Sequence, residues 1–188
     1  MTISATPTHL QDATQLLSQA GFKTSNIWYH GTSSGLVDSI LENGLLQSGD
    51  TESIKKVKGA MIAIGDSFKE NKDPIFLTQS RELAYYWATK RAQSRSQLFS
   101  TTETPAVLAI TLPDNLNTNI KTDVGAAAFL MGESEEYLQT LNELYSVNGF
   151  KAPEVDPITA DRMDYLNFLG MAYSKQAIAS EFIETLIA

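Results

Sequence analysis

The sequence contains no cysteine among its 188 residues, and this absence removes several classes of site at once. Disulfide bonds, thiolate-bound zinc and iron–sulfur clusters all need cysteine. Histidine occurs only at His9 and His30, so a histidine-rich metal site is excluded as well. This count does not exclude a carboxylate site for magnesium or calcium, but no residue is assigned to a metal.

Basic residues are scarce too, because 14 lysines and arginines stand against 22 aspartates and glutamates and give a formal net charge of −8. Binding to nucleic acid needs a basic face that neutralises phosphates, so no nucleic-acid partner is expected. No apolar run reaches the length of a membrane span, and residues 1–6 lack the features of a signal peptide. We expect a cytoplasmic protein without a membrane partner, although a dedicated secretion system can deliver a chain that carries no cleavable signal.

The length suits one domain over residues 1–188, and the hydrophobic patterns predict a mixed α+β fold. Strands are predicted at 27–30, 74–78, 105–112 and 176–187, and helices at 7–20, 36–43, 80–93 and over much of 122–172. The strand at 105–112 is apolar on both faces and is therefore expected to be central. Residues 47–73 are expected to be irregular, either as a lid over a site or as a surface excursion.

The segment Ile27-Trp28-Tyr29-His30-Gly31-Thr32 holds the only candidate for a catalytic histidine. It is interpreted as a strand that ends at His30, followed by a tight turn and a helix that Ser33 or Ser34 can cap. Gly31 would let another molecule approach the backbone closely. On these residues alone, His30 is either a ligand-binding imidazole or a buried histidine with its hydrogen bonds satisfied.

Two further groups carry candidate chemistry. Tyr85, Tyr86 and Trp87 follow a helix start at Ser80 and are most simply aromatics of the core and its rim. Glu181 and Glu184 lie on opposite faces of the predicted last strand. A carboxylate in an apolar strand is costly unless it faces water, a partner or a substrate, so either glutamate is a candidate.

In this order, the motifs resemble those of the ADP-ribosyltransferases of the diphtheria-toxin and poly(ADP-ribose) polymerase type, whose sites are described by a His-Tyr-Glu triad. The first and most specific match is Tyr29-His30-Gly31-Thr32 followed by Ile40-Leu41-Glu42-Asn43-Gly44-Leu45. The second is Ile75-Phe76-Leu77-Thr78 followed by Ala84-Tyr85-Tyr86, and the third is Ser180-Glu181-Phe182-Ile183. The spacing from Thr78 to Ala84 and Tyr86 is also similar, more loosely, to that of the small rifampin-modifying transferases.

The resemblance implies a split β-sandwich with surrounding helices, a helical C-terminal insertion and NAD as co-substrate. It implies that Gly31 binds the nicotinamide amide, that His30 and Thr32 hold the adenosine ribose, and that Tyr86 and Phe76 stack on the nicotinamide ring. Glu181 would be the catalytic carboxylate, with Glu184 as the alternative. The chain departs from the polymerases at Leu83, where they have a serine that holds the nicotinamide amide, and at Phe76, where they have a tyrosine.

Cleavage of the bond between nicotinamide and ribose passes through an oxocarbenium-like state, so a site needs an aromatic slot, an orienting clamp and one nearby negative charge. The first hypothesis is an NAD-dependent mono-ADP-ribosyltransferase that acts on a protein or a small molecule. The second is an inactive relative that binds NAD or a protein. An RNA 2′-phosphotransferase is the third, and the acidic composition disfavours it. The acceptor, the oligomeric state and a housekeeping, toxin or effector role stay open.

Overall fold

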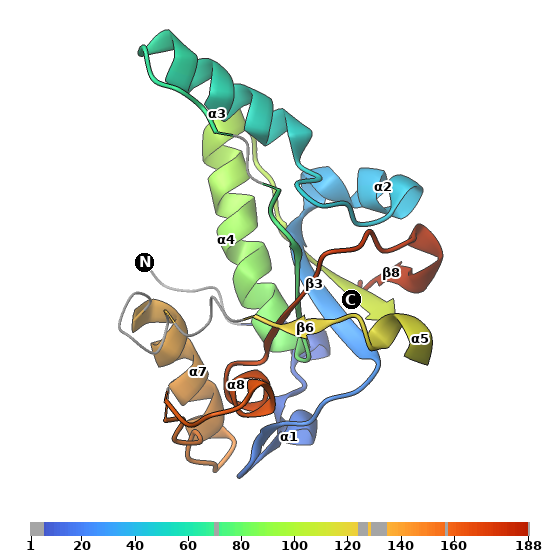
Figure 1. The fold of residues 1–188 in the computed structure, drawn as a ribbon, viewed down its shortest axis with the longest axis vertical. Helices are drawn as coiled ribbons and strands as arrows, with labels where there is room; N and C mark the ends of the chain where they lie inside the picture. The colour runs from blue at the N-terminus through green and yellow to red at the C-terminus, as the bar shows by residue number, and fades with distance from the viewer. Residues whose placement is uncertain (1–5, 70–71, 124–127, 129–134, 157, 188) are drawn as a thin grey trace.

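A computed structural model describes residues 6–69, 72–123, 128, 135–156 and 158–187. The predicted α+β class is confirmed, because the described helices pack around two antiparallel sheets (Figure 1). None of the described helices has the length and apolar character needed to cross a membrane.

The larger sheet has six strands and is divided near its middle. Their order is β6 (Lys121–Thr122), β7 (Met171–Ser174), β4 (Ile75–Thr78), β3 (Ile27–Ser33), β5 (Pro105–Thr111) and β8 (Ile183–Thr185). β3 pairs with β5 along its whole length, whereas it pairs with β4 only where Tyr29 meets Thr78. The six strands therefore form one sheet that opens between β3 and β4.

β3 is longer than predicted. The strand continues through Gly31, Thr32 and Ser33, because each of these residues pairs with β5. His30 therefore lies within the strand and not at its end. α2 (Ser34–Asn43) follows directly, and Ser33 occupies its N-cap position without a capping hydrogen bond, since its hydroxyl donates to Glu103.

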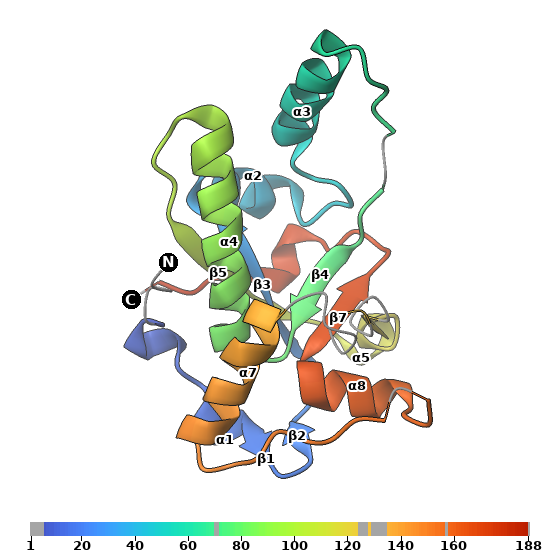
Figure 2. The same ribbon diagram turned by 90° about the vertical axis from the view of Figure 1, so that its left-hand side faces the viewer.

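α4 (Arg81–Phe99) crosses β3 and β5 and is longer than predicted (Figure 2). Ser80 caps its first turn as expected, and the Ser80 hydroxyl also donates to Asp12 at 2.8 Å. Glu82 accepts hydrogen bonds from the backbone N–H groups of Asp12 and Ala13. These contacts tie the start of α4 to the N-terminal segment.

The predicted continuous helix over residues 7–20 is wrong, because the contacts of Asp12 and Ala13 with the start of α4 interrupt it. The segment forms η1 (Thr8–Leu10), α1 (Ala13–Leu16) and the small sheet of β1 (Leu17–Ser18) and β2 (Gly21–Phe22). His9 is exposed, as expected.

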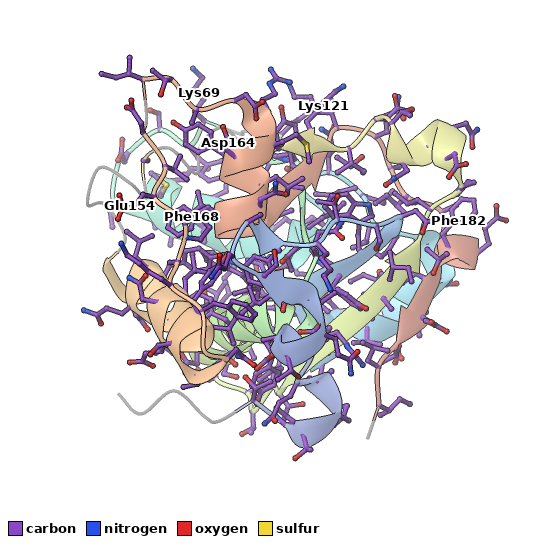
Figure 3. All side chains as sticks on the ribbon, turned by 90° about the horizontal axis from the view of Figure 1, so that it is seen from below. Lys69, Lys121, Glu154, Asp164, Phe168 and Phe182 are labelled. Atoms are coloured by element: carbon purple, nitrogen blue, oxygen red, sulfur yellow. The ribbon has the colours of Figure 1, made fainter. Side chains whose placement is uncertain are left out.

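The C-terminal half contains two longer helices, α7 (Glu135–Val147) and α8 (Arg162–Leu169), beside the strands β6, β7 and β8. α7 buries Tyr137, Leu141 and Tyr145 in one cluster with residues of α4 and α8. Figure 3 shows Phe168 between α7 and α8 and Phe182 on the opposite side of the molecule. A second cluster lies on the other face of the sheet and includes Trp28, Leu108 and Ile110.

Two predictions of secondary structure, for residues 47–73 and for residues 176–187, differ from the structure. Residues 47–73, expected to be irregular, contain α3 (Thr51–Ala63), which projects beyond the rest of the fold (Figures 1 and 2). Asp50 caps α3 by accepting from the Ser53 backbone N–H at 3.1 Å. The predicted last strand is reduced to β8, preceded by the short turn η3 (Ser180–Phe182). The turn after β5 forms α5 (Asp114–Asn117).

Candidate functional site

A cavity of about 860 Å³ lies where β3 and β4 separate. Its walls come from β3, β4, β7, α2, α3 and α4 and from the segments beside them. The described residues that line it include Tyr29, His30, Gly31, Thr32, Ile40, Leu45, Leu46, Asp50, Ile54, Val57, Phe68, Asp73, Phe76, Thr78, Trp87, Lys90, Arg91, Ser94, Asp123 and Met171. Four predicted site residues, His30, Gly31, Thr32 and Phe76, are thus brought together.

His30 bridges the opening in the sheet. Its Nδ1 lies 2.8 Å from the carbonyl oxygen of Phe76 on β4, in place of the backbone pairing that the two strands lack there. Burial lowers the pKa of His30, and the positive charge of Arg91 acts in the same direction, while the Phe76 carbonyl opposes both. The imidazole is therefore neutral at pH 7, with Nδ1 as the donor to Phe76.

Gly31 packs on the protein itself. A Cβ at this position would lie 2.0 Å from the carbonyl oxygen of Ala84 and 2.7 Å from the backbone nitrogen of Ala88. The close approach that glycine allows at this position is thus made by α4. The missing Cβ of Gly31 sets the distance between α4 and β3. Thr32, beside it, is 1 % exposed and also borders the cavity.

Apolar side chains contribute to the lining of the cavity. Leu46, Val57 and Phe76 all line it while remaining 40 to 49 % exposed. Ile54 and Phe68 also line the cavity and are partly buried. Exposed apolar residues collected around a concave site are typical of a surface that binds a ligand.

The structure does not place Tyr86 on the described cavity wall. Tyr86 is 6 % exposed, and its ring packs edge-on against Tyr137 with centroids 5.5 Å apart. Burial and the charge of Glu136 raise the pKa of Tyr86 to about 12. Leu83, one turn earlier, is buried in the same cluster, and neither Leu83 nor Tyr86 lines the cavity.

Neither candidate glutamate lies on that wall. Glu181 is exposed on η3, and Glu184 is exposed on β8, where it pairs with Ala109. Phe182, the neighbour of Glu181, lies on the side of the molecule opposite to α7, against which Tyr86 packs (Figure 3). The described cavity therefore brings together the first motif and Phe76 but not all three members of the expected triad.

The cavity wall contains side chains that the sequence reasoning did not select. Trp87, Lys90, Arg91 and Ser94 lie on one face of α4, and their spacing of three and four residues is the available signal. Asp123, 9 % exposed, follows β6, and its backbone N–H donates to the Met171 carbonyl at 3.1 Å. No local pattern connects Asp123 to His30, because sheet pairing alone brings them to one cavity.

A network of charges holds α3 beside this cavity. Arg95 is 4 % exposed and binds Asp50 at 2.5 Å and Glu103 at 2.8 Å, while Arg91 binds Asp50 at 2.7 Å. Burial by itself would raise the pKa of Asp50, but the hydrogen bonds from Arg95 and Ser53 bring it below its usual range. Asp50 is thus ionised, and it links the start of α3 to α4.

The described side chains contain no group of three or more histidines, aspartates or glutamates arranged to hold a metal ion. A scan against models of known protein families finds no match to the chain, and searches of curated proteins and of solved structures find none either.

Proposed function

We propose that the protein is an NAD-dependent mono-ADP-ribosyltransferase with a variant of the ADP-ribosyltransferase-like fold. The observation that carries the proposal is the separation of β3 from β4 at His30-Gly31-Thr32, which opens a cavity beside the first motif. Past Tyr29 and Thr78, β4 no longer pairs with β3. Backbone groups on that edge, the imidazole of His30 and the hydroxyl of Thr32 can then bind a polar ligand.

The reaction would break the bond between the nicotinamide nitrogen and the ribose carbon. The bonding electron pair leaves with nicotinamide, which becomes neutral, and the ribose passes through an oxocarbenium-like state. A nucleophilic oxygen or nitrogen of a protein or small-molecule acceptor then bonds to that carbon and loses its proton to solvent. Nicotinamide is a good leaving group, so the site has to orient and stabilise the reactants more than to donate a proton.

In this proposal His30 and Thr32 hold a ribose of NAD, and Phe76 packs on the nicotinamide ring. The neutral state of His30 supports the role, because its second ring nitrogen can accept a hydrogen bond from a ribose hydroxyl. Glu181 supplies the carboxylate only if η3 moves towards the cavity when NAD or the acceptor binds.

The test is nicotinamide release from NAD by the purified protein, with and without cell lysate as a source of acceptor. His30→Ala should reduce release by about a hundredfold through misplacement of the ribose. His9→Ala, which changes the exposed histidine, is the matched control and should leave the rate unchanged. Release that is absent under all conditions, or that is equal in His30→Ala, would sink the proposal.

A second candidate function is an NAD-binding module without catalysis. The exposed position of Glu181, outside the described cavity wall, favours this candidate. Calorimetry with NAD separates the two functions, because a binding module binds NAD without releasing nicotinamide. Within the transferase proposal, Glu181→Gln decides whether this carboxylate takes part: a catalytic carboxylate would show a large loss of release, and a surface residue would show none.

A further inference from the structure

Trp87 and Asp123 both line the cavity, and each interacts with Tyr137, Trp87 through its ring and Asp123 through its charge. The Trp87 ring stacks on Tyr137 with centroids 5.3 Å apart and an angle of 29° between the rings. Burial raises the pKa of Tyr137 above its usual range, and the Asp123 carboxylate is among the nearby groups that raise it further. Tyr137 is fully buried, and its hydroxyl donates to the Leu169 carbonyl at 2.5 Å. The Tyr137 ring is therefore held in place against the Trp87 indole, and the charge of Asp123 acts on its hydroxyl.

The two side chains offer complementary chemistry to a positively charged ring. Tryptophan is the best aromatic partner for a cation, and such a contact strengthens when water is displaced from it. Asp123 is only 9 % exposed although it borders the cavity. A carboxylate this buried attracts an opposite charge more strongly than one in water, because the local dielectric is lower.

We propose that Trp87 and Asp123 form a subsite for a planar organic cation, with the indole against the ring and the carboxylate beside its charge. The identification of that cation as the nicotinamide ring of oxidised NAD rests on the proposed function. In that case Trp87, and not Tyr86, is the aromatic residue of α4 that positions the ring. The subsite also favours release of the product, because nicotinamide is neutral once its bond to ribose has broken.

Fluorescence can report on this subsite directly. The chain has two tryptophans, and Trp28 is buried in the other core cluster, where its Nε1 donates to Asn117 at 2.6 Å. Trp28→Phe leaves Trp87 as the sole tryptophan, and its quenching is followed on addition of 1-methylnicotinamide, a cation, or of neutral nicotinamide. We expect saturable quenching and about tenfold tighter binding of the cation, a ratio that corresponds to about 1.4 kcal/mol.

The same two ligands are titrated by calorimetry into the wild-type protein, so that the result does not depend on the folding of Trp28→Phe. Asp123→Asn keeps the shape and removes the charge, and it should bring the ratio of the two affinities close to one. Asp73→Asn is the matched control, because Asp73 also lines the cavity but is exposed. Trp87→Leu should weaken the binding of both ligands.

Equal affinities for the cation and the neutral ligand in the wild-type protein would overturn the inference. An equal loss of selectivity in Asp73→Asn and Asp123→Asn would also overturn it, because the overall charge of the cavity would then explain the effect. The outcome for the transferase is separate. Selective binding of 1-methylnicotinamide without nicotinamide release from NAD keeps the subsite and removes the transferase. Nicotinamide release without selective binding of 1-methylnicotinamide keeps the transferase and removes the subsite.

Discussion

Gly31 shows how one residue sets the spacing between β3 and α4. Because a Cβ there would meet the backbone of Ala84 and Ala88 at 2.0 and 2.7 Å, neither neighbour can turn aside as a flexible side chain could. Gly31→Ala should therefore lower the free energy of unfolding by at least about 1–3 kcal/mol, the usual cost of overpacking. Urea unfolding followed by circular dichroism measures this change.

Gly59→Ala is the control for this substitution. Gly59 lies within α3, and no atom comes within 4 Å of the position that its Cβ would occupy. Alanine has the higher helix propensity, so this variant should be stabilised by up to about 1 kcal/mol. If Gly31→Ala were as stable as wild type, the close packing of α4 on β3 would be wrong.

His30 makes stability depend on pH in a defined direction. Burial lowers its pKa in the folded protein, while the unfolded chain keeps a value of about 6.5. When the pH falls below about 6.5, the unfolded state takes up a proton first, so the folded state loses stability until the folded pKa is reached. Above about 6.5 both states are neutral, and this contribution is constant.

The measurement compares the free energy of unfolding of wild type and His30→Gln between about pH 5 and about pH 8. The wild-type curve should fall more steeply on the acid side, and the difference between the two curves isolates His30. His9→Gln serves as the control and should follow wild type. A parallel course of the His30→Gln and wild-type curves would contradict a lowered pKa of His30 in the folded protein.

His30, Gly31, Thr32 and Phe76 could be predicted as cavity residues because the first motif and the start of β4 are local patterns. The orientation of Tyr86 and Trp87 could not be predicted. Both fit an amphipathic helix, but α7 covers the side of α4 that carries Tyr86, and this cover comes from residues far along the chain. Which face of a helix meets a cavity is decided by such distant packing.

At the scale of elements, the ion pairs of the buried Arg95 hold the N-terminal end of α3 in place. Arg95→Met removes the cationic partner of Glu103, whereas Asp50 keeps its ion pair with Arg91. We expect a loss of about 3 kcal/mol in the free energy of unfolding, at the lower end of the cost of breaking a buried ion pair. Amide hydrogens of α3 should exchange faster, because Ser53 is the only described residue of α3 that is buried.

Glu52→Gln tests whether this effect depends on burial. Glu52 lies 3.9 Å from Arg95, but its side chain is 74 % exposed. Its removal should change stability by less than about 1 kcal/mol, as for other exposed ion pairs. A similarly small effect of Arg95→Met, with unchanged exchange in α3, would show that the charges do not anchor this helix.

Elements with strong local patterns could be predicted well. The strands at Ile75–Thr78 and Pro105–Thr111 and the Ser80 cap of α4 are confirmed. α3 was missed because an exposed helix that holds Gly59 and several lysines lacks the wide apolar stripe of a packed helix. The predicted strand at 176–187 was too long, because its apolar residues pair in pieces, Ile178 with Leu45 and Ile183 with Ile110.

At the scale of the whole molecule, the sheet consists of two half-sheets, β3-β5-β8 and β4-β7-β6. They meet at Tyr29 and Thr78 and through the hydrogen bond between His30 and the Phe76 carbonyl. The cavity is lined by both halves, so a ligand in it contacts residues of both at the same time. Binding should therefore stabilise the sheet as a unit and not only the helix or loop nearest to the ligand.

This coupling predicts how NAD changes stability. At a concentration of about 100 times its Kd, NAD should raise the free energy of unfolding by about 2.7 kcal/mol, because it binds only the folded state. Hydrogen exchange should slow in β3 and in β4 together, and His30→Ala should weaken both effects because it removes the side chain that joins the halves. Slower exchange confined to β4, or to β3, would mean that the ligand rests on one half-sheet and that the opening between them is not its binding site.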